Sequence, residues 1–398
     1  MGLRPRAQFN TRVESCHFNG KEWQVQIRRA DGSIAQAAHT FLVAATGQLN
    51  VPNVPANLDR GAFHGPSFHT AEWDHAVDLA GKRVACVGTG ASAIQALPII
   101  APAAAELKVF QRSPGWIIAK NDYAYSALTK WLFRFVPGLR ALYRAMLFAW
   151  MDYAWFMMVP DSAEKPSWRN AFIERTVRNT RPLLPLPELE SAETIGCKRL
   201  LITDLWFPMF QRPNVELITQ PVAKVLPRGL QTADGATHEV DVIVYATGFK
   251  TNDFVPGVRV SSSCMNAQTL RDVWGDAPTA YMGGLVPGFP NLWLTYGPNM
   301  NVNHSSVLSL MEHGVDFFRQ LVERTVDGGV DSFQCTQRAH DDYNRAIQSE
   351  LDSSVFNANC DSWYKKNSAK RIVNNYPGPV LRYWMHTRRV DWNDIELR

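Results

Sequence analysis

The sequence predicts an α/β fold with parallel β-sheets, and three observations carry this prediction. Residues 83–113 contain a short apolar run, a glycine-containing turn, a helical stretch and a second apolar run. Two strand-like runs far apart in the chain both end in Ala-Thr-Gly, at residues 45–47 and 246–248. The composition, with 46% hydrophobic and 20% charged residues, is typical of a folded globular protein. The 398 residues are enough for two or three domains.

The segment 83–113 has the order of elements of a Rossmann-like βαβ unit. Its first run is apolar and partly β-branched, as in a buried parallel strand, and residues 107–111 form the second strand. Gly88 permits a tight turn, Gly90 lets a pyrophosphate approach the backbone, and Ala93 is small enough for close packing of helix against strand. The helix N-terminus then faces the phosphates. We predict that a dinucleotide is bound by Gly88, Thr89, Gly90, Ala91, Ser92 and Ala93.

The end of the second strand predicts NADP(H) rather than NAD(H). An acidic residue there would bind the ribose 2′-hydroxyl of NAD, whereas an arginine accommodates the 2′-phosphate of NADP. Arg112 and Ser113 occupy this place, and no acidic residue lies between Glu106 and Asp122. We therefore expect both residues to bind the 2′-phosphate of NADP(H).

Charge and cysteine usage exclude several classes of protein. The net charge is +4, and basic and acidic residues are interspersed without a block of one sign, so we expect no nucleic-acid partner. The six cysteines are scattered without a CxxC pair, which favours a reduced, cytoplasmic protein without a metal site. No uncharged run reaches the length of a membrane-spanning helix, so we expect no integral membrane segment.

A second motif lies in a linker that is rich in proline and glycine. Phe63, Gly65, His69, Trp73 and Asp74 have the spacing FxGxxxHxxxWD. This pattern matches the fingerprint of the Baeyer–Villiger monooxygenases, which the chain resembles over nearly its whole length. The related N- and S-oxidising flavin monooxygenases share the front of the pattern but usually carry Tyr or Phe in the place of Trp73.

The resemblance implies a flavin-dependent monooxygenase that uses FAD, NADPH and O2. In this family NADPH reduces FAD, oxygen gives a C4a-peroxyflavin, and the peroxide inserts oxygen beside the carbonyl of a small ketone. An N- or S-oxidising monooxygenase, acting for example on a sulfide, is the alternative. The fingerprint would couple cofactor binding to domain movement.

The resemblance also assigns residues to the site. A GxKR segment supplies the active-site arginine in this family, which makes Arg199 the catalytic residue that stabilises developing negative charge. Lys198 would lie near the 2′-phosphate with Arg112. On spacing alone, the basic pair is better explained as solvated surface residues. Further cofactor-binding candidates are Thr46, Gly47 and Gln48 at the first Ala-Thr-Gly end, and Asn301 and Val307 on the flavin side.

The two Ala-Thr-Gly ends imply, by the same resemblance, an NADP-binding domain inserted into an FAD-binding domain. We predict a remnant of the FAD domain at residues 1–47, the linker at 48–80, the NADP domain at 81–246 and a return to the FAD domain at 247–398. Two Rossmann-like domains are thus expected, the FAD one being incomplete. Residues 123–190 are interpreted as a helical insertion, and a basic amphipathic surface resting on a membrane is the alternative.

Local patterns predict further elements. Strands are expected at residues 23–28, 41–45, 215–218, 241–245 and 292–296. A helix capped by serine is expected from residues 305–306 to about 322, with Val307, Leu308, Met311 and Val315 facing the core. A structural loop and cap is an equally good interpretation of Asn301 and Val307.

The glycine-rich turn of the family's flavin domain does not occur between Met1 and Thr46. A fragment, a flavin half supplied by another chain, or a non-catalytic NADP-binding protein would each explain this. We predict that the purified chain holds FAD poorly, because that turn would bind the FAD pyrophosphate. An absorbance spectrum taken after incubation with FAD and removal of excess flavin tests this. Stoichiometric bound flavin would contradict it.

Overall fold

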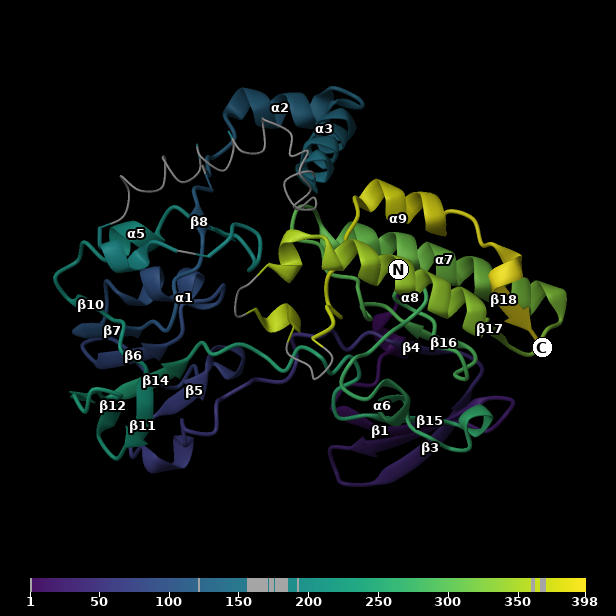
Figure 1. Ribbon diagram of the computed structural model, residues 1–398, viewed down its shortest axis with the longest axis horizontal. Helices are drawn as coiled ribbons and strands as arrows, with labels where there is room; N and C mark the ends of the chain where they lie inside the picture. The colour runs from purple at the N-terminus through teal and green to yellow at the C-terminus, as the bar shows by residue number, and fades with distance from the viewer. Residues whose placement is uncertain are drawn as a thin grey trace.

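Two lobes lie side by side, with a pair of helices above them, as Figure 1 shows. The computed structural model describes residues 2–398 apart from 121, 156–170, 172–174, 176–184, 192, 359–361 and 366–369. We call the lobe that contains the glycine turn the parallel-sheet lobe. The other lobe carries both chain ends and is called the terminal lobe (Figure 1).

A five-stranded parallel sheet forms the centre of the parallel-sheet lobe, in the order β10-β7-β6-β14-β5. The strands are β5 (Ser67–His69), β6 (Arg83–Val87), β7 (Glu106–Phe110), β10 (Val215–Ile218) and β14 (Val242–Tyr245). The sequence predicts four of these strands to within one residue. The fifth, β5, lies inside the segment interpreted as a linker and pairs with β14.

Both faces of this sheet are covered, as expected for parallel strands. Val84 and Cys86 of β6 join the cluster formed with the helices on one face, while Ala85 and Val87 join the cluster on the other. This alternation follows the two-residue period of a strand. The covering elements are the helices α1 (Ala93–Ile100) and α5 (Trp206–Met209) and an antiparallel sheet of β11 (Val222–Leu226), β12 (Gly229–Thr232) and β13 (Thr237–Glu239).

The terminal lobe contains a four-stranded sheet and a separate parallel strand pair. The larger sheet has the order β15-β1-β2-β3 and consists of β1 (Thr11–Phe18), β2 (Trp23–Arg29), β3 (Ile34–His39) and β15 (Arg259–Ser262). The parallel pair is β4 (Leu42–Ala44) with β16 (Leu292–Leu294). The buried Trp23 indole donates to the Pro290 carbonyl at 3.0 Å and so ties the sheet to the start of β16.

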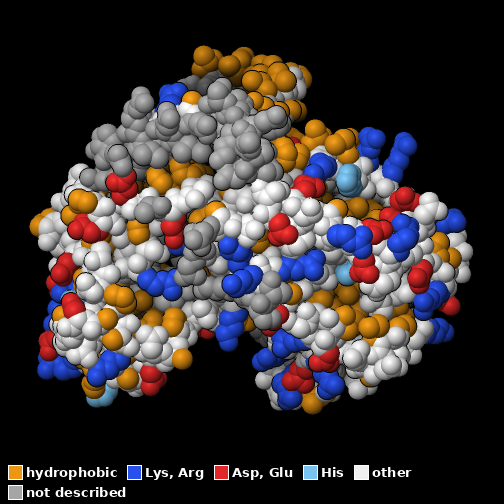
Figure 2. Space-filling view, in the orientation of Figure 1, with side chains coloured by type: hydrophobic (Ala, Val, Ile, Leu, Met, Phe, Trp, Pro, Cys, Tyr) orange, Lys and Arg blue, Asp and Glu red, His pale blue; other side chains and the backbone are white. Residues whose placement is uncertain are grey.

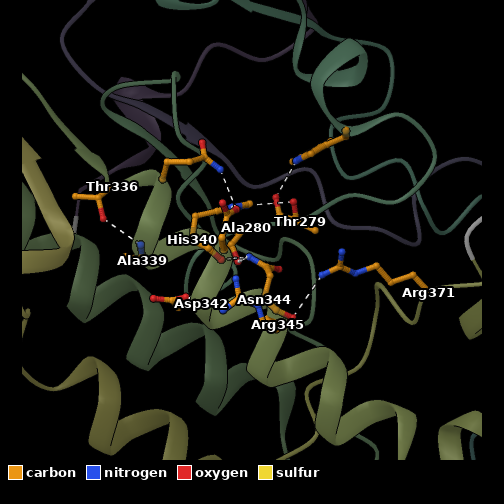
Figure 3. A network of polar contacts seen from close by, with 12 residues as sticks. Thr279, Ala280, Thr336, Ala339, His340, Asp342, Asn344, Arg345 and Arg371 are labelled. Atoms are coloured by element: carbon orange, nitrogen blue, oxygen red, sulfur yellow. Dashed lines mark hydrogen bonds and ion pairs between the residues drawn. The ribbon is translucent and has the colours of Figure 1, made fainter.

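Four helices and a short antiparallel strand pair complete the terminal lobe. They are α6 (Leu270–Trp274), α7 (Val307–Gly328), α8 (Gln337–Asp352), α9 (Val380–Thr387), β17 (Phe333–Cys335) and β18 (Ile395–Leu397). Figure 3 shows how α8 is fastened: His340 Nε2 lies 3.1 Å from Thr279 Oγ1, and Asn344 donates to the Ala280 carbonyl at 3.3 Å. Arg371 in turn reaches the Asn344 carbonyl at 3.4 Å.

Helix α7 differs from its prediction in length and in its buried face. It continues to Gly328, and Ser306 occupies the N-cap position without a side-chain hydrogen bond. The predictions that Leu308 and Val315 face the core are wrong, since their exposed fractions are 67% and 46%. Apolar residues occur on both sides of this helix, so the local period does not identify the packed side. The buried residues are Leu310, Gly314, Phe317, Leu321 and Thr325.

The two Ala-Thr-Gly segments lie where the chain passes between the lobes, and the two crossings bind each other. Thr46 Oγ1 donates to the Phe254 carbonyl at 2.8 Å. Thr247 Oγ1 donates to the Asn53 carbonyl at 2.7 Å, and the Asn53 N–H donates to the Gly248 carbonyl at 2.9 Å. The repeated sequence therefore forms two antiparallel crossings, each of which uses its threonine to hold the other.

A helical hairpin follows the strand β8 (Ile117–Ile118), which pairs with β9 (Leu201–Ile202) at the far end of the insertion. The hairpin consists of α2 (Ala127–Phe135) and α3 (Leu139–Tyr153), and Gly138 between them has a φ of 76°. The predicted insertion at 123–190 is thus helical over its first half. Most of residues 156–184 lie outside the described residues.

Asp152 anchors this hairpin to the terminal lobe. Its carboxylate accepts hydrogen bonds from the N–H groups of Val380 and Leu381, at 2.6 and 3.1 Å, at the first turn of α9. His304 Nε2 lies 3.5 Å from the same carboxylate. Burial raises the pKa of Asp152, but His304 and the two N–H groups outweigh burial and hold it below its usual 3.8.

In the part of the chain that the structure describes, no helix is long and apolar enough to cross a membrane. The same residues contain no cluster of three or more His, Cys, Asp or Glu side chains arranged to hold a metal ion.

We predict that Asp152→Ala lowers the free energy of unfolding by about 1–2 kcal/mol at neutral pH, because it removes a cap of α9. Since the folded pKa of Asp152 is depressed, its contribution is present above the unfolded pKa and is lost as the pH falls through the folded value. Denaturant midpoints at several pH values measure this. The control is Asp342→Ala, at an exposed carboxylate of α8. A difference between Asp152→Ala and the parent that persists in acid would contradict the prediction.

Candidate functional site

The glycine turn is shaped by both its backbone and its packing. Gly88 has a φ of +108°, and a Cβ there would lie 2.4 Å from the Ala246 carbonyl oxygen at the end of β14. At Gly90 a Cβ would meet only open space, so this side of the turn is accessible. Ala93 begins α1 and is completely buried against the sheet. The first turn of the eight-residue helix leaves its N–H groups at the carboxyl edge of the sheet.

Lys198 and Ser113 come together at the carboxyl end of β7. Lys198 Nζ lies 3.2 Å from Ser113 Oγ and 2.6 Å from Glu193 Oε1. Arg112 precedes Ser113, and its side chain is exposed. The structure therefore places a cation and a hydroxyl beside the second strand, and Glu193 orients the cation.

Arg199, the next residue, lies near a different set of groups. Its charge acts on the hydroxyls of Tyr296 and Tyr364, both in the terminal lobe. Burial raises the pKa of Tyr296, and burial raises that of Tyr364 to about 12, in each case against the opposing effect of the Arg199 cation. The Arg199 side chain itself remains exposed. Both tyrosines are therefore neutral phenols, and the Arg199 cation acts on each of them.

Gln48 and Asn301 meet through Tyr296. The Tyr296 hydroxyl donates to Asn301 Oδ1 at 3.1 Å and lies 3.5 Å from Gln48 Nε2. Asn301 Nδ2 donates to Asn375 Oδ1 at 2.7 Å. Gln48 is 2% exposed, and its Oε1 has no hydrogen-bond partner in the described structure. A buried acceptor without a partner is unfavourable, so this position fits the polar group of a bound ligand.

The other flavin-side candidates have structural contacts of their own. Thr46 is engaged in the crossing described above, and Gly47 has a φ of +68° at the same bend. Val307 is half-buried at the start of α7 and packs against the cluster that contains Tyr364. Tyr296, which belongs to the Gln48–Tyr296–Asn301 network, packs against the same cluster.

The fingerprint residues build the edge of the parallel sheet. Phe63 is buried in its core, and Trp73 packs edge-on against Phe68 of β5 with ring centroids 4.9 Å apart. A Cβ at Gly65 would lie 2.7 Å from the Asp241 carbonyl oxygen, so only glycine fits. Asp74 Oδ1 accepts the N–H of Ala76 at 3.0 Å, which stabilises the following turn.

His69 connects this edge to a lobe crossing. It ends β5, is completely buried, and lies edge-on to Phe249, which follows the second Ala-Thr-Gly segment, with ring centroids 5.4 Å apart. Its Nδ1 accepts the Ala71 N–H at 3.1 Å. Burial lowers the pKa of His69, and the nearby Gly248 backbone only partly offsets this. His69 is therefore a neutral ring packed beside the crossing.

The cysteines depart from the expectation of a fully reduced chain at one position. Cys197, buried directly before Lys198, is disulfide-bonded. Four others are free thiols: Cys16, Cys86, Cys264 and Cys335.

Several residues of the site were missed by the sequence analysis. Glu193, Tyr296, Asn303 and Tyr364 contact predicted site residues or each other, and Asn303 Nδ2 donates to the Tyr364 hydroxyl at 2.7 Å. Tyr296 is the last residue of the predicted strand at 292–296, directly before Gly297-Pro298, and this position at a strand end is the one signal that was available. Glu193 and Asn303 lie in loops without a recognisable pattern, and Tyr364 lies in the short 3-10 helix Trp363–Lys365.

Comparisons with known proteins identify the family, although no family model matches the chain. A Baeyer-Villiger monooxygenase of Streptomyces coelicolor is 33% identical over 406 residues, which cover 100% of this chain and 76% of that protein. The FAD-binding monooxygenase ktnD of Aspergillus niger is 32% identical over 414 residues, covering 100% of this chain and 67% of the relative.

The fold agrees with these relatives. The crystal structure of OTEMO in complex with FAD and NADP superposes with a TM-score of 0.82 at 23% identity, covering 100% of this chain and 82% of that one. This match shows the fold with two dinucleotide-binding domains that the sequence predicts. The chain carries the fingerprint and the βαβ unit, and both relatives match it over its whole length. It therefore belongs to the flavin-dependent monooxygenases of the Baeyer–Villiger type.

Proposed function

We propose that this chain binds NADPH and FAD and uses O2 to insert oxygen beside the carbonyl of a small ketone. The observation that carries the proposal is that two adjacent residues, Lys198 and Arg199, act on different groups. Lys198 faces Ser113 at the end of β7, whereas the charge of Arg199 acts on Tyr296 and Tyr364. One short segment thus carries a cation at the end of β7 and a second cation whose charge acts on two tyrosines of the terminal lobe.

In this proposal the NADP phosphates are bound at the carboxyl edge of the parallel sheet. The turn from Gly88 to Ala93 supplies backbone N–H groups for the pyrophosphate. Lys198, Ser113 and Arg112 bind the 2′-phosphate, with Lys198 as a point charge and the hydroxyl as a donor. The Glu193 carboxylate holds Lys198 in position at 2.6 Å.

The FAD candidates in this chain are Thr46, Gly47, Gln48, Asn301 and Val307. The unpartnered Oε1 of Gln48 supports this assignment, since it offers an acceptor to a polar group of the ring. Bound flavin, reduced by NADPH, supplies the activation of oxygen. The chain's own contribution is the dry polar surface of Gln48, Tyr296 and Asn301.

Arg199 acts as the electrostatic catalyst in this proposal. A guanidinium stays charged at every working pH, and it stabilises the negative charge that develops on oxygen during transfer. The buried hydroxyls of Tyr296 and Tyr364 remain protonated, because burial raises their pKa values. The positive charge therefore stays available to the reacting atoms and is not neutralised by a tyrosinate.

The proposed domain division assigns residues 81–246 to NADP binding and residues 1–47 with 247–398 to the flavin side. Residues 48–80, which contain Phe63, Gly65, His69, Trp73 and Asp74, connect the two. Contact of His69 with Phe249 supports a coupling role, because a change at the sheet edge reaches the crossing through this pair. By its resemblance to the family fingerprint, Trp73 favours ketone oxidation over sulfide oxidation. The ratio of ester to sulfoxide products distinguishes these two activities.

We predict that Lys198→Ala weakens binding of 2′,5′-ADP about tenfold or more, because a charged hydrogen bond contributes about 1.5–3 kcal/mol. Binding of 5′-AMP, which lacks the 2′-phosphate, should not change. Tryptophan fluorescence titration of both ligands measures this. Lys224→Ala, an exposed lysine on β11, is the matched control. An equal loss for both ligands would contradict the role of Lys198 at the 2′-phosphate.

We predict that Arg199→Ala lowers kcat for oxidation of a cyclic ketone about 100- to 1000-fold, the loss typical when a charge-stabilising group is removed. Arg199→Lys should retain part of the activity, and affinity for 2′,5′-ADP should stay constant. The assay uses saturating FAD and NADPH under air with quantification of the ester. The control is Arg228→Ala, at a side chain that is 77% exposed and paired with Glu239. Binding of NADPH without its oxidation by the parent chain would overturn the catalytic assignment.

A further inference from the structure

The helical hairpin exposes an apolar surface that its own packing does not use. On α2, Leu128, Trp131 and Phe135 follow the spacing i, i+3, i+7, and on α3, Leu142, Met146 and Trp150 follow i, i+4, i+8. Such spacings place side chains on one face of a helix. The exposed fractions of these six side chains run from 54% at Trp131 to 69% at Trp150. Figure 2 shows hydrophobic atoms gathered over this end of the molecule.

The contacts inside the hairpin are made by other residues. The rings of Tyr125, Phe133 and Tyr143 pack on one another, with centroids 5.2 to 6.4 Å apart. Phe148 packs against a core cluster of the terminal lobe, and Asp152 caps α9. These residues already join α2 to α3, and α3 to the terminal lobe. The six apolar side chains are therefore not needed for these contacts. An exposed face of this kind marks an interaction surface.

Four cations lie on the same two helices, outside the apolar face. They are Lys130 and Arg134 on α2, and Arg140 and Arg144 on α3. Among the described residues none of them forms an ion pair with a carboxylate, and Arg134 lies 5.3 Å from the Phe135 ring centroid. Asp152 is the only acidic residue on the two helices, and it is buried. The hairpin therefore combines an exposed apolar face with exposed cations and has no exposed carboxylate.

We propose that this hairpin docks on an anionic lipid surface, with the six apolar side chains in the headgroup region and the four cations paired with lipid phosphates. Tryptophan is favoured at the membrane–water interface, and basic residues gain binding energy from anionic lipids. A second copy of the chain is a poorer occupant. In a symmetric dimer through this hairpin the cations would meet no carboxylate of the partner hairpin, because Asp152, the only acidic residue of the two helices, is buried.

The test uses the full chain and vesicles of phosphatidylcholine with about 30 mol% phosphatidylglycerol, against phosphatidylcholine alone, in a sedimentation assay. We expect the chain to bind the anionic vesicles at least about tenfold more strongly than the neutral ones. Added salt should weaken this binding, because it screens the charges. Equal binding to both vesicles, or binding to neither, would overturn the proposal.

Two double variants separate the contributions of charge and apolar surface. Trp131→Ala with Trp150→Ala should lower partitioning about tenfold or more on anionic vesicles, because two exposed aromatic rings are lost. Lys130→Gln with Arg144→Gln should lower it about tenfold or more, since each cation contributes about 1 kcal/mol near an anionic surface. Unchanged affinity for 2′,5′-ADP shows that the variants fold.

The matched controls carry the same substitutions elsewhere on the surface. They are Trp392→Ala, which is 43% exposed on the terminal lobe, and Lys224→Gln on β11. Loss of binding in the controls to the same degree would contradict the assignment to the hairpin. Concentration-dependent dimers that disappear in the double tryptophan variant, without vesicle binding by the parent, would show that a second copy occupies the face instead.

Discussion

The mutual hold of the two lobe crossings is the interaction on which the rest of the structure depends. Thr46 and Thr247 each donate a hydroxyl hydrogen bond to a carbonyl of the opposite crossing, at 2.8 and 2.7 Å. The two segments that link the lobes are thereby hydrogen-bonded to each other. Because the chain passes between the parallel-sheet lobe and the terminal lobe at this connection, it helps to set where the end of β7 lies relative to Tyr296.

The end of the helical insertion places Lys198 and Arg199 at the boundary between the two lobes. Strand β9 returns to pair with β8, and Lys198 and Arg199 lie just before β9. The two side chains therefore reach the boundary from a segment that begins and ends beside the parallel sheet. Asp152 holds the insertion to α9 at the same time, so the segment contacts both lobes.

Buried polar groups give the terminal side of the site its chemical character. Tyr296, Asn301 and Asn375 are joined by hydrogen bonds, while Gln48 Oε1 and Asn375 Nδ2 have no partner in the described structure. In a dry environment such hydrogen bonds are strong, and unmet ones are unfavourable. The network is thus rigid and selective for a polar ligand group, and the nearby Arg199 adds a positive charge that burial of the tyrosines leaves unneutralised.

The sequence by itself determined the elements that depend only on interactions between residues close together in the chain. The bounds of β6 and β10 follow from short apolar runs, and the turn at Gly88 follows from its glycine pattern. Only the tertiary structure decided that β5 joins the parallel sheet and that Lys198 lies beside Ser113. It also decided which face of α7 is buried. Each of these depends on a partner tens of residues away, and the periodicity or spacing of one segment carries no information about such a partner.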